Sequence, residues 1–335
     1  MRAFTSAGER VAVDTEPAWA GRLVDAAVGA PRDDPRVNGD AQVDGDPTVR
    51  IRVEARRTEF PRTGLRPVTR GAYSDGRRTL FLDAGGSGFD LLLVMGDDQL
   101  SVIARYRPPA RTRLANVVAA SRFRLLAGQV LVHYPVLWRA GLRGRVPLHA
   151  SVARTGAGTP LLAGPGGVGK STVLVGLLAD GAAATADNLC CADRSLCFGL
   201  VEPLRTDAVP GGPVLSAAGA GARTSHGRTE WPLTARVPVL APDRIVVLER
   251  GVHTEISPIP AAEAARTLVA GTYAAGELRR YWAFAATLAL ATGRGPAHPP
   301  VVEVAADHAG RLPCVRVRVG DGDSVTAAQL CGENP

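Results

Sequence analysis

Residues 164–171 read Gly164-Pro165-Gly166-Gly167-Val168-Gly169-Lys170-Ser171, and this motif is the most specific indication of fold in the sequence. It matches G-x-x-x-x-G-K-[ST], the pattern of a phosphate-binding loop that joins a strand to a helix. The flanks agree, because residues 161–163 are a short apolar run and residues 168–179 have the composition of a helix. Glycines let successive backbone N–H groups point into an anion-binding nest, and the helix N-terminus adds its positive end. The sequence therefore predicts a nucleotide-phosphate site.

Lys170 is the only lysine among 39 lysine and arginine residues. Arginine replaces a solvated lysine readily, but not a compact ammonium group in a tight site. In such loops the lysine reaches the β- and γ-phosphates, and the next hydroxyl, here that of Ser171, is placed to ligate Mg²⁺. A guanine-specific N-K-x-D motif needs a further lysine, so ATP is favoured over GTP. We expect ATP and Mg²⁺ as cofactors, held by Gly164, Pro165, Gly166, Gly167, Val168, Gly169, Lys170, Ser171 and Thr172.

The composition restricts the other classes of function. A chain of 335 residues, 46% of them hydrophobic, has the length of two globular domains. The formal net charge of +7 indicates an anionic macromolecule only weakly, because the arginines are scattered and aromatic residues make up 5%. We therefore expect no nucleic-acid partner. No apolar run reaches the roughly 20 residues of a membrane span, and the N-terminus lacks the apolar core of a signal peptide. We expect no membrane partner and a cytoplasmic protein.

The cysteines indicate neither a zinc site nor a disulfide framework. There are five of them, and none forms a C-x-x-C pair. The doublet Cys190-Cys191 fits a buried strand with two small apolar side chains, and a redox or metal role is the alternative.

Hydrophobic periodicity predicts an α/β fold in two parts. The N-terminal part has strands expected at residues 49–53, 79–83, 89–95 and 100–106, then a helix at 112–133 that Pro135 stops or kinks. The second part mixes strands expected at 146–153, 161–163, 182–186, 189–198, 244–248, 301–304 and 315–319 with helices at 168–179 and 261–292, the latter broken near residue 276. Residues 30–48 and 208–221 read as loops. We expect a β-rich, antiparallel domain with a connecting helix over 1–140, which could bind the acceptor, a nucleotide-binding domain over 141–325 and a frayed tail at 326–335.

Three further side chains are expected near the loop. A hairpin centred near residue 157 brings His149 beside it, for a phosphate contact or proton handling; the alternative is a partly buried strand histidine. Asp187 ends the strand at 182–186, and residues just past strand C-termini line the site of a doubly wound sheet. Asp187 therefore faces Mg²⁺ or the acceptor hydroxyl, unless it only forms a turn with the next residue. Glu249, after the strand at 244–248, is a second candidate metal ligand or a solvated strand end.

These residues together resemble the C-terminal domain of HPr kinase/phosphorylase and its kinase-like relatives. The resemblance runs from Leu148-His149-Ala150-Ser151 through the loop to Asp187-Asn188, and residues 133–138 also match. It implies a P-loop kinase that uses ATP and Mg²⁺ to phosphorylate a serine hydroxyl of a small protein, peptide or small molecule. It also implies that Lys170 binds phosphate, Ser171 binds Mg²⁺, Asp187 is the general base and His149 lies beside the phosphates. Homo-oligomers are common in that family.

The chain departs from the family pattern at three places. Thr172 stands where the family has a glutamate, Asn188 replaces a second aspartate, and residues 202–232 lack the phosphorylase signature. We therefore expect neither phosphorolysis nor HPr itself as the acceptor. The alternative function is a non-catalytic ATP-binding sensor or assembly protein with a degenerate kinase site. A carboxykinase-like or motor-type ATPase is a third interpretation.

Overall fold

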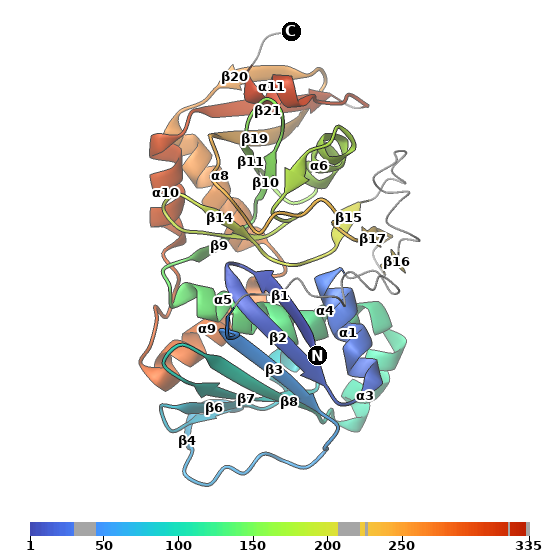
Figure 1. Cartoon of the computed structure of the whole chain (residues 1–335), viewed down its shortest axis with the longest axis vertical. Coiled ribbons are helices and arrows are strands. Elements are labelled where there is room, and N and C mark those ends of the chain that lie inside the picture. Colours follow the sequence, from blue (N-terminus) through green and yellow to red (C-terminus); the bar gives the residue numbers. More distant parts are fainter. Residues whose placement is uncertain (30–44, 207–221, 225–226, 321, 333–335) are drawn as a thin grey trace. The chain divides into compact units, whose positions relative to one another are not determined.

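The computed structural model describes residues 1–29, 45–206, 222–224, 227–320 and 322–332 (Figure 1). The chain forms two compact units, unit 1 (Met1–Gly144 with Arg280–Pro299) and unit 2 (Arg145–Arg279 with Pro300–Pro335). Both mix helices and strands, so the predicted α/β class is confirmed at this level. The sequence placed residues 280–299 in the second domain, whereas the structure groups them with unit 1. The expected loop at 208–221 and most of that at 30–48 lie outside the described residues.

Unit 1 is built on an eight-stranded sheet in the order β1-β2-β3-β8-β7-β6-β5-β4. Its strands are β1 (Arg2–Ser6), β2 (Glu9–Thr15), β3 (Val49–Glu54), β4 (Arg66–Thr69), β5 (Ala72–Ser74), β6 (Arg78–Phe81), β7 (Phe89–Met95) and β8 (Leu100–Tyr106). The predicted antiparallel pairing holds from β8 to β4 and for β1 with β2, but the β2–β3 and β3–β8 pairs are parallel. Parallel neighbours need a crossover connection, and α1 (Ala18–Val28) lies in the one between β2 and β3.

The helical segment of unit 1 continues through Pro135. It consists of α3 (Ala110–Val118), α4 (Ala120–Gly128), the π-helical turn η2 (Gln129–His133) and α5 (Tyr134–Gly141). Proline lacks an N–H and its ring clashes with the preceding turn of an α-helix. Because the wider π turn comes first, Pro135 stands in the first turn of α5, where it is tolerated. The helices of unit 1 also include the 3₁₀ turn η1 (Ala84–Gly86) and α9 (Arg279–Thr292).

Unit 2 contains three sheets among its described residues, with strand orders β12-β10-β11-β19-β21-β20, β18-β14-β13-β9 and β15-β17-β16. The strands are β9 (Val146–Leu148), β10 (Ser151–Arg154), β11 (Pro160–Ala163), β12 (Ala183–Ala184), β13 (Cys190–Ala192), β14 (Cys197–Gly199), β15 (Leu204–Thr206), β16 (Ala222–Arg223), β17 (Thr229–Trp231), β18 (Val239–Leu240), β19 (Arg244–Gly251), β20 (Glu255–Pro258) and β21 (Cys314–Gly320). In the largest sheet β11, β19 and β21 run parallel. Their carboxyl ends therefore share one edge, where the loop at 164–169 begins.

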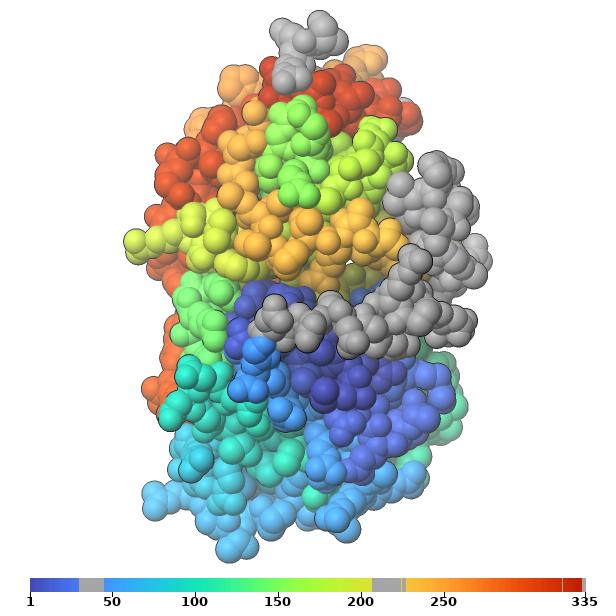
Figure 2. All heavy atoms as spheres, viewed as in Figure 1, coloured from blue at the N-terminus to red at the C-terminus, as the bar shows by residue number. Residues whose placement is uncertain are grey.

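The segment at 146–153, predicted as one strand, is two strands in different sheets. β9 pairs with β13, whereas β10 pairs with β11 and β12, and the chain changes sheet at His149 and Ala150. The predicted β10–β11 hairpin is confirmed, with Ser151 opposite Leu162. Its turn lies at the surface, in bright green in Figure 2. The cysteine doublet is confirmed as part of a fully buried strand, β13.

The helices of unit 2 are α6 (Lys170–Ala179), α8 (Ala261–Ala274), α10 (Val301–Arg311) and α11 (Ala327–Cys331). The predicted break near residue 276 is confirmed, because it separates α8 from α9. The strand predicted at 301–304 is wrong, since these residues form the first turn of α10. Valines favour strands by propensity, but Val301 and Val304 stand three apart and are both buried on one helical face. Tertiary packing thus overrides local preference.

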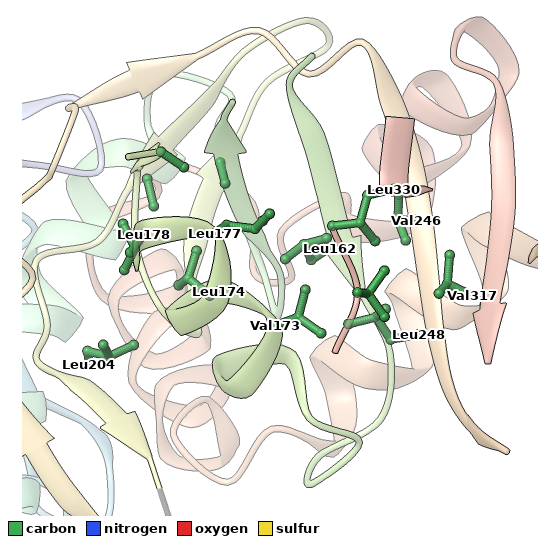
Figure 3. Close-up of a cluster of buried hydrophobic side chains, with 14 residues drawn as sticks. Leu162, Val173, Leu174, Leu177, Leu178, Leu204, Val246, Leu248, Val317 and Leu330 are labelled. Carbon is green, nitrogen blue, oxygen red and sulfur yellow. The ribbon is translucent and has the colours of Figure 1, made fainter. Parts of the chain in front are cut away.

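A hydrophobic cluster holds α6 against the largest sheet of unit 2 (Figure 3). Leu174 and Leu177 of α6 are fully buried with Leu162 of β11 and Leu248 of β19. Burial of each such side chain contributes about 1.5–3 kcal/mol. The cluster therefore fixes the start of α6 relative to β11, which defines the two ends of the loop between them. Leu330 of α11 packs in the same cluster, so part of the expected tail belongs to the folded unit.

Candidate functional site

The loop between β11 and α6 has the strand–loop–helix arrangement that the sequence predicted. Gly164, Gly167 and Gly169 have φ values of 148°, 79° and 109°, which favour glycine over residues with a side chain. At Gly164 a Cβ atom would also lie 2.8 Å from the backbone oxygen of Leu248, so this position requires a close approach to β19. Helix α6 begins at Lys170, and its free N–H groups face the loop.

Lys170 is enclosed by its own loop. Its Nζ atom donates hydrogen bonds to the backbone oxygens of Gly164 (2.9 Å) and Pro165 (3.2 Å), and the residue is buried. Burial lowers the pKa of Lys170 to about 8, while the carboxylates of Asp187 and Glu277 act to raise it. The ammonium group thus carries its charge at neutral pH with little water around it. A desolvated cation of this kind attracts phosphate oxygens more strongly than a surface lysine does.

Asp187 follows β12 and is buried beside the start of α6. Its Oδ2 atom accepts a hydrogen bond from the backbone N–H of Arg205 at 2.9 Å. Its Oδ1 atom is buried and has no hydrogen bond of normal geometry, although the Ser171 hydroxyl is close enough to lower the pKa of this carboxyl. Burial outweighs that effect and those of Arg205 and Lys170, so the pKa of Asp187 is raised. The structure thus brings Lys170, Ser171 and Asp187 together, with one carboxylate oxygen unsatisfied.

His149 lies where the chain passes from β9 to β10. Its backbone N–H donates to the Thr272 hydroxyl at 3.0 Å, and its Nε2 atom lies 2.7 Å from Oδ1 of Asn188. The Asn188 amide donates from its nitrogen to Glu277, which assigns that oxygen as an acceptor and the Nε2 proton to His149. Burial, then the charge of Lys170, lowers the pKa of His149 to about 4. The imidazole is therefore neutral at physiological pH, which favours a positioning contact over proton transfer.

Two residues that the sequence analysis did not select, the buried Glu202 and the partly buried Arg205, support the turn at 187–189. Glu202 accepts hydrogen bonds from the backbone N–H groups of Asn188 (3.0 Å) and Leu189 (2.8 Å) through one carboxylate oxygen. The guanidinium group of Arg205, whose backbone N–H holds Asp187, lies 3.6 Å from a carboxyl oxygen of Glu202 and forms an ion pair with Glu230 at 3.1 Å. A glutamate and an arginine three apart are common on protein surfaces. Nothing in the local sequence therefore marked these two as parts of the site.

We expect Glu202→Gln to flatten the pH dependence of stability. Burial raises the pKa of Glu202 from 4.5 to about 8. The folded state therefore holds a proton that the unfolded state releases above about pH 4.5, so this group's contribution is full below that pH and is lost as pH rises to about 8. Glutamine stays neutral. Between pH 5 and pH 8 the free energy of unfolding of the variant should therefore rise by a few kcal/mol relative to that of the native chain. Denaturant titrations at both pH values measure the difference, and parallel curves would contradict the raised pKa.

Glu249 points away from the loop. Side chains alternate along a strand, and Val246 and Leu248 face the α6 cluster, so Glu249 faces the other side of β19. There it forms ion pairs with Arg316 (3.1 Å) and Arg318 (3.4 Å). These contacts give no support to its expected role as a metal ligand.

Arg250, one residue later, alternates back to the α6 side of β19. One of its guanidinium nitrogens donates to the backbone oxygen of Gly167 in the loop at 2.9 Å. The Arg250 side chain forms no other hydrogen bond and no ion pair among the described residues, so its charge is not paired with a carboxylate there. Sequence reasoning selected the acidic neighbour, because an apolar strand of five residues does not reveal which face it turns to the loop.

The described residues contain no group of three or more histidine, cysteine, aspartate or glutamate side chains able to hold a metal ion. Of the three residues that the sequence analysis assigned to Mg²⁺, Ser171 and Asp187 lie together beside the loop, whereas Glu249 does not. No helix within the described ranges has both the length and the apolar character needed to cross a membrane. No protein-family model matches the chain, and a search of curated proteins found no match.

Proposed function

We propose that this protein is an ATP- and Mg²⁺-dependent phosphotransferase with an HPr-kinase-like P-loop domain. Its acceptor is a hydroxyl group, expected to be a serine, on a small protein, a peptide or a small molecule. The observation that carries the proposal is that Lys170 and Ser171 lie close to the buried carboxyl group of Asp187, of which one oxygen lacks a hydrogen bond of normal geometry.

The residues present fit a nucleotide triphosphate. Three loop glycines have positive φ values, as a loop whose N–H groups bind an anion requires, and the Lys170 ammonium group is bonded to the loop backbone. These residues would hold the phosphates, while Ser171 would hold Mg²⁺. When bound, the metal nucleotide supplies the transferable phosphoryl group and neutralises its charge.

Asp187 is the residue suited to receive the proton of the acceptor hydroxyl. Its Oδ1 atom lacks a normal hydrogen bond, and burial raises its pKa toward that of a stronger base. The backbone N–H of Arg205 fixes the other oxygen, so the carboxylate cannot rotate freely. His149 forms a hydrogen bond with Asn188, the residue after Asp187, and this bond helps to hold the turn at 187–189 in place.

The direct test is incubation of the purified chain with γ-labelled ATP, Mg²⁺ and a panel of serine peptides and small alcohols. Transfer of label to an acceptor, confirmed as a phosphate ester by mass spectrometry, is the expected result. Omission of Mg²⁺ should abolish the transfer. ATP binding without any transfer or ADP release across the panel would contradict the proposal.

That contrary result would favour the second candidate, a non-catalytic ATP-binding sensor or assembly protein. One observation supports it: Asn188 stands beside Asp187, and its amide is committed to His149 and Glu277. The site therefore has one carboxylate where the resembled kinases have two.

We expect Arg250→Ala to weaken ATP binding by about tenfold or more, as loss of one hydrogen bond to a charged group does. Arg250 contacts the loop oxygen of Gly167 and carries an unpaired charge next to the expected phosphates. Isothermal titration with ATP measures the effect. Arg154→Ala is the matched control, because Arg154 is an exposed arginine at the end of β10 near the hairpin turn, away from the loop. Equal loss in both variants would contradict a specific role for Arg250.

A further inference from the structure

Unit 1 contains a pocket between α3, α4 and η1 that the proposed function does not use. Its volume is about 380 Å³, which falls within the range of small-ligand sites. The chain turns sharply at Ala119, with φ −106° and ψ 52°, so α3 and α4 meet at a corner that forms the pocket wall. Arg111 and Thr112 of α3 and Arg122 and Phe123 of α4 are among its lining residues.

The floor of the pocket is held in place before any ligand binds. The Phe123 ring lies 5.5 Å from the ring of Tyr106 and 6.4 Å from that of Phe89, centroid to centroid. The Asn116 amide donates to the Tyr106 hydroxyl (3.1 Å) and to the backbone oxygen of Ser87 (3.3 Å). These contacts connect both helices to the underlying sheet, so a ligand would meet a formed cavity.

The rim of the pocket is positively charged. Arg111 and Arg122 are exposed and contact no carboxylate among the described residues. Helices α3 and α4 carry four arginines in total, and the sequence has no aspartate or glutamate from residue 99 to residue 179. Because no acid in the described part of the chain pairs with these guanidinium groups, a ligand with carboxylates is favoured there.

The outer face of α3 is apolar and uncovered. No residue of this helix is buried, and Leu114, Val117 and Val118 are 67%, 71% and 80% exposed. A helix of a folded domain ordinarily turns such residues toward its core. Three exposed aliphatic side chains next to two free arginines match a partner that presents both apolar and acidic groups.

We propose that this pocket binds a peptide segment in which carboxylate side chains stand next to apolar ones. The carboxylates pair with Arg111 and Arg122, and the apolar side chains cover Leu114 and Val118. Because the site is concave, a projecting peptide side chain fits it better than a flat lipid surface would. Phe123 is the one aromatic residue among those that line the pocket, so the pocket offers no row of rings on which successive nucleotide bases could stack. The inference does not depend on phosphoryl transfer.

The test is fluorescence anisotropy of the full chain with a labelled peptide made of glutamate, leucine and alanine. Binding should weaken by about tenfold or more in the double variant R111E/R122E. The double variant R66E/R70E reverses two exposed arginines elsewhere in unit 1 and should bind as the native chain does. A peptide with glutamine in place of glutamate should bind weakly, and Leu114→Ser should lower the affinity without affecting folding.

Equal affinity of R111E/R122E and the native chain would overturn the proposal, as would failure of the native chain to bind. Tighter binding to phosphatidylserine vesicles or to a single-stranded oligonucleotide than to the peptide would also overturn it. Circular dichroism of each variant keeps the result interpretable, because α3 buries no side chain and its substitution should leave the fold intact.

Discussion

Lys170→Arg should reduce ATP-dependent turnover by about 10²–10³-fold, the usual effect of removing one group that stabilises transition-state charge. The reason is steric and electronic. The lysine ammonium is buried between two loop carbonyl oxygens, at 2.9 and 3.2 Å, where the larger planar guanidinium does not fit. Arginine also retains its full charge when buried, whereas burial lowers the pKa of Lys170 to about 8. The measurement is ADP release with saturating ATP, together with an ATP titration.

The same chain offers a sharp control, because arginine fills every other strongly basic position. Thermal unfolding of Lys170→Arg should match that of the native chain within a few degrees, since the cluster under α6 is untouched. If Lys170→Arg keeps native turnover, the loop does not require a compact ammonium group. The proposal that Lys170 binds the nucleotide phosphates would then fail. Lys170→Met separates shape from charge, and it should lose turnover at least as completely.

The local part of this site could be predicted from the sequence. The loop, the strand before it and the helix after it are contiguous, so their pattern is visible within some twenty residues. The position of Asp187 also followed from the chain, because a helix and one turn return it to the sheet beside Ser171. The structure places the two side chains close together, as expected.

The remainder depends on contacts that no local pattern encodes. Glu202 and Arg205 support Asp187 only because β15 packs against α6, and this contact is set by the tertiary fold. Glu249 and Arg250 are neighbours, and which of them faces the loop depends on the register of a buried strand. The strand predicted at 301–304 failed for a related reason, since three valines read alike on a strand and on a helix.

Asp187→Asn should abolish phosphoryl transfer while ATP binding is retained. Loss of a general base costs about 10²–10⁴-fold in rate. The amide keeps the shape of the carboxyl, and its oxygen can still accept the Arg205 N–H bond at 2.9 Å. Label transfer to the acceptor measures the first effect and an ATP titration the second. Asp180→Asn, at the exposed end of α6, is the matched control and should behave as the native chain does.

The pH dependence adds an independent readout. Burial raises the pKa of Asp187, and a base must be deprotonated to act, so activity should rise as pH rises through that value. The free energy of unfolding should change in the opposite direction. Because the pKa of Asp187 is higher in the folded state than in the unfolded state, this group stabilises the fold fully below its unfolded-state pKa. That contribution is lost as pH rises through its folded-state pKa. Asp187→Asn, which stays neutral, should therefore be at least as stable as the native chain at pH 8.

Loss of activity together with equal or greater stability is what separates a functional carboxylate from a structural one. A structural aspartate in this turn would lose stability on substitution, because its hydrogen bonds would weaken without relief of any buried charge. A destabilised Asp187→Asn variant with intact transfer would therefore assign Asp187 to the fold alone. It would leave Lys170 and the loop as a nucleotide-binding site without a base, which is the arrangement of a sensor.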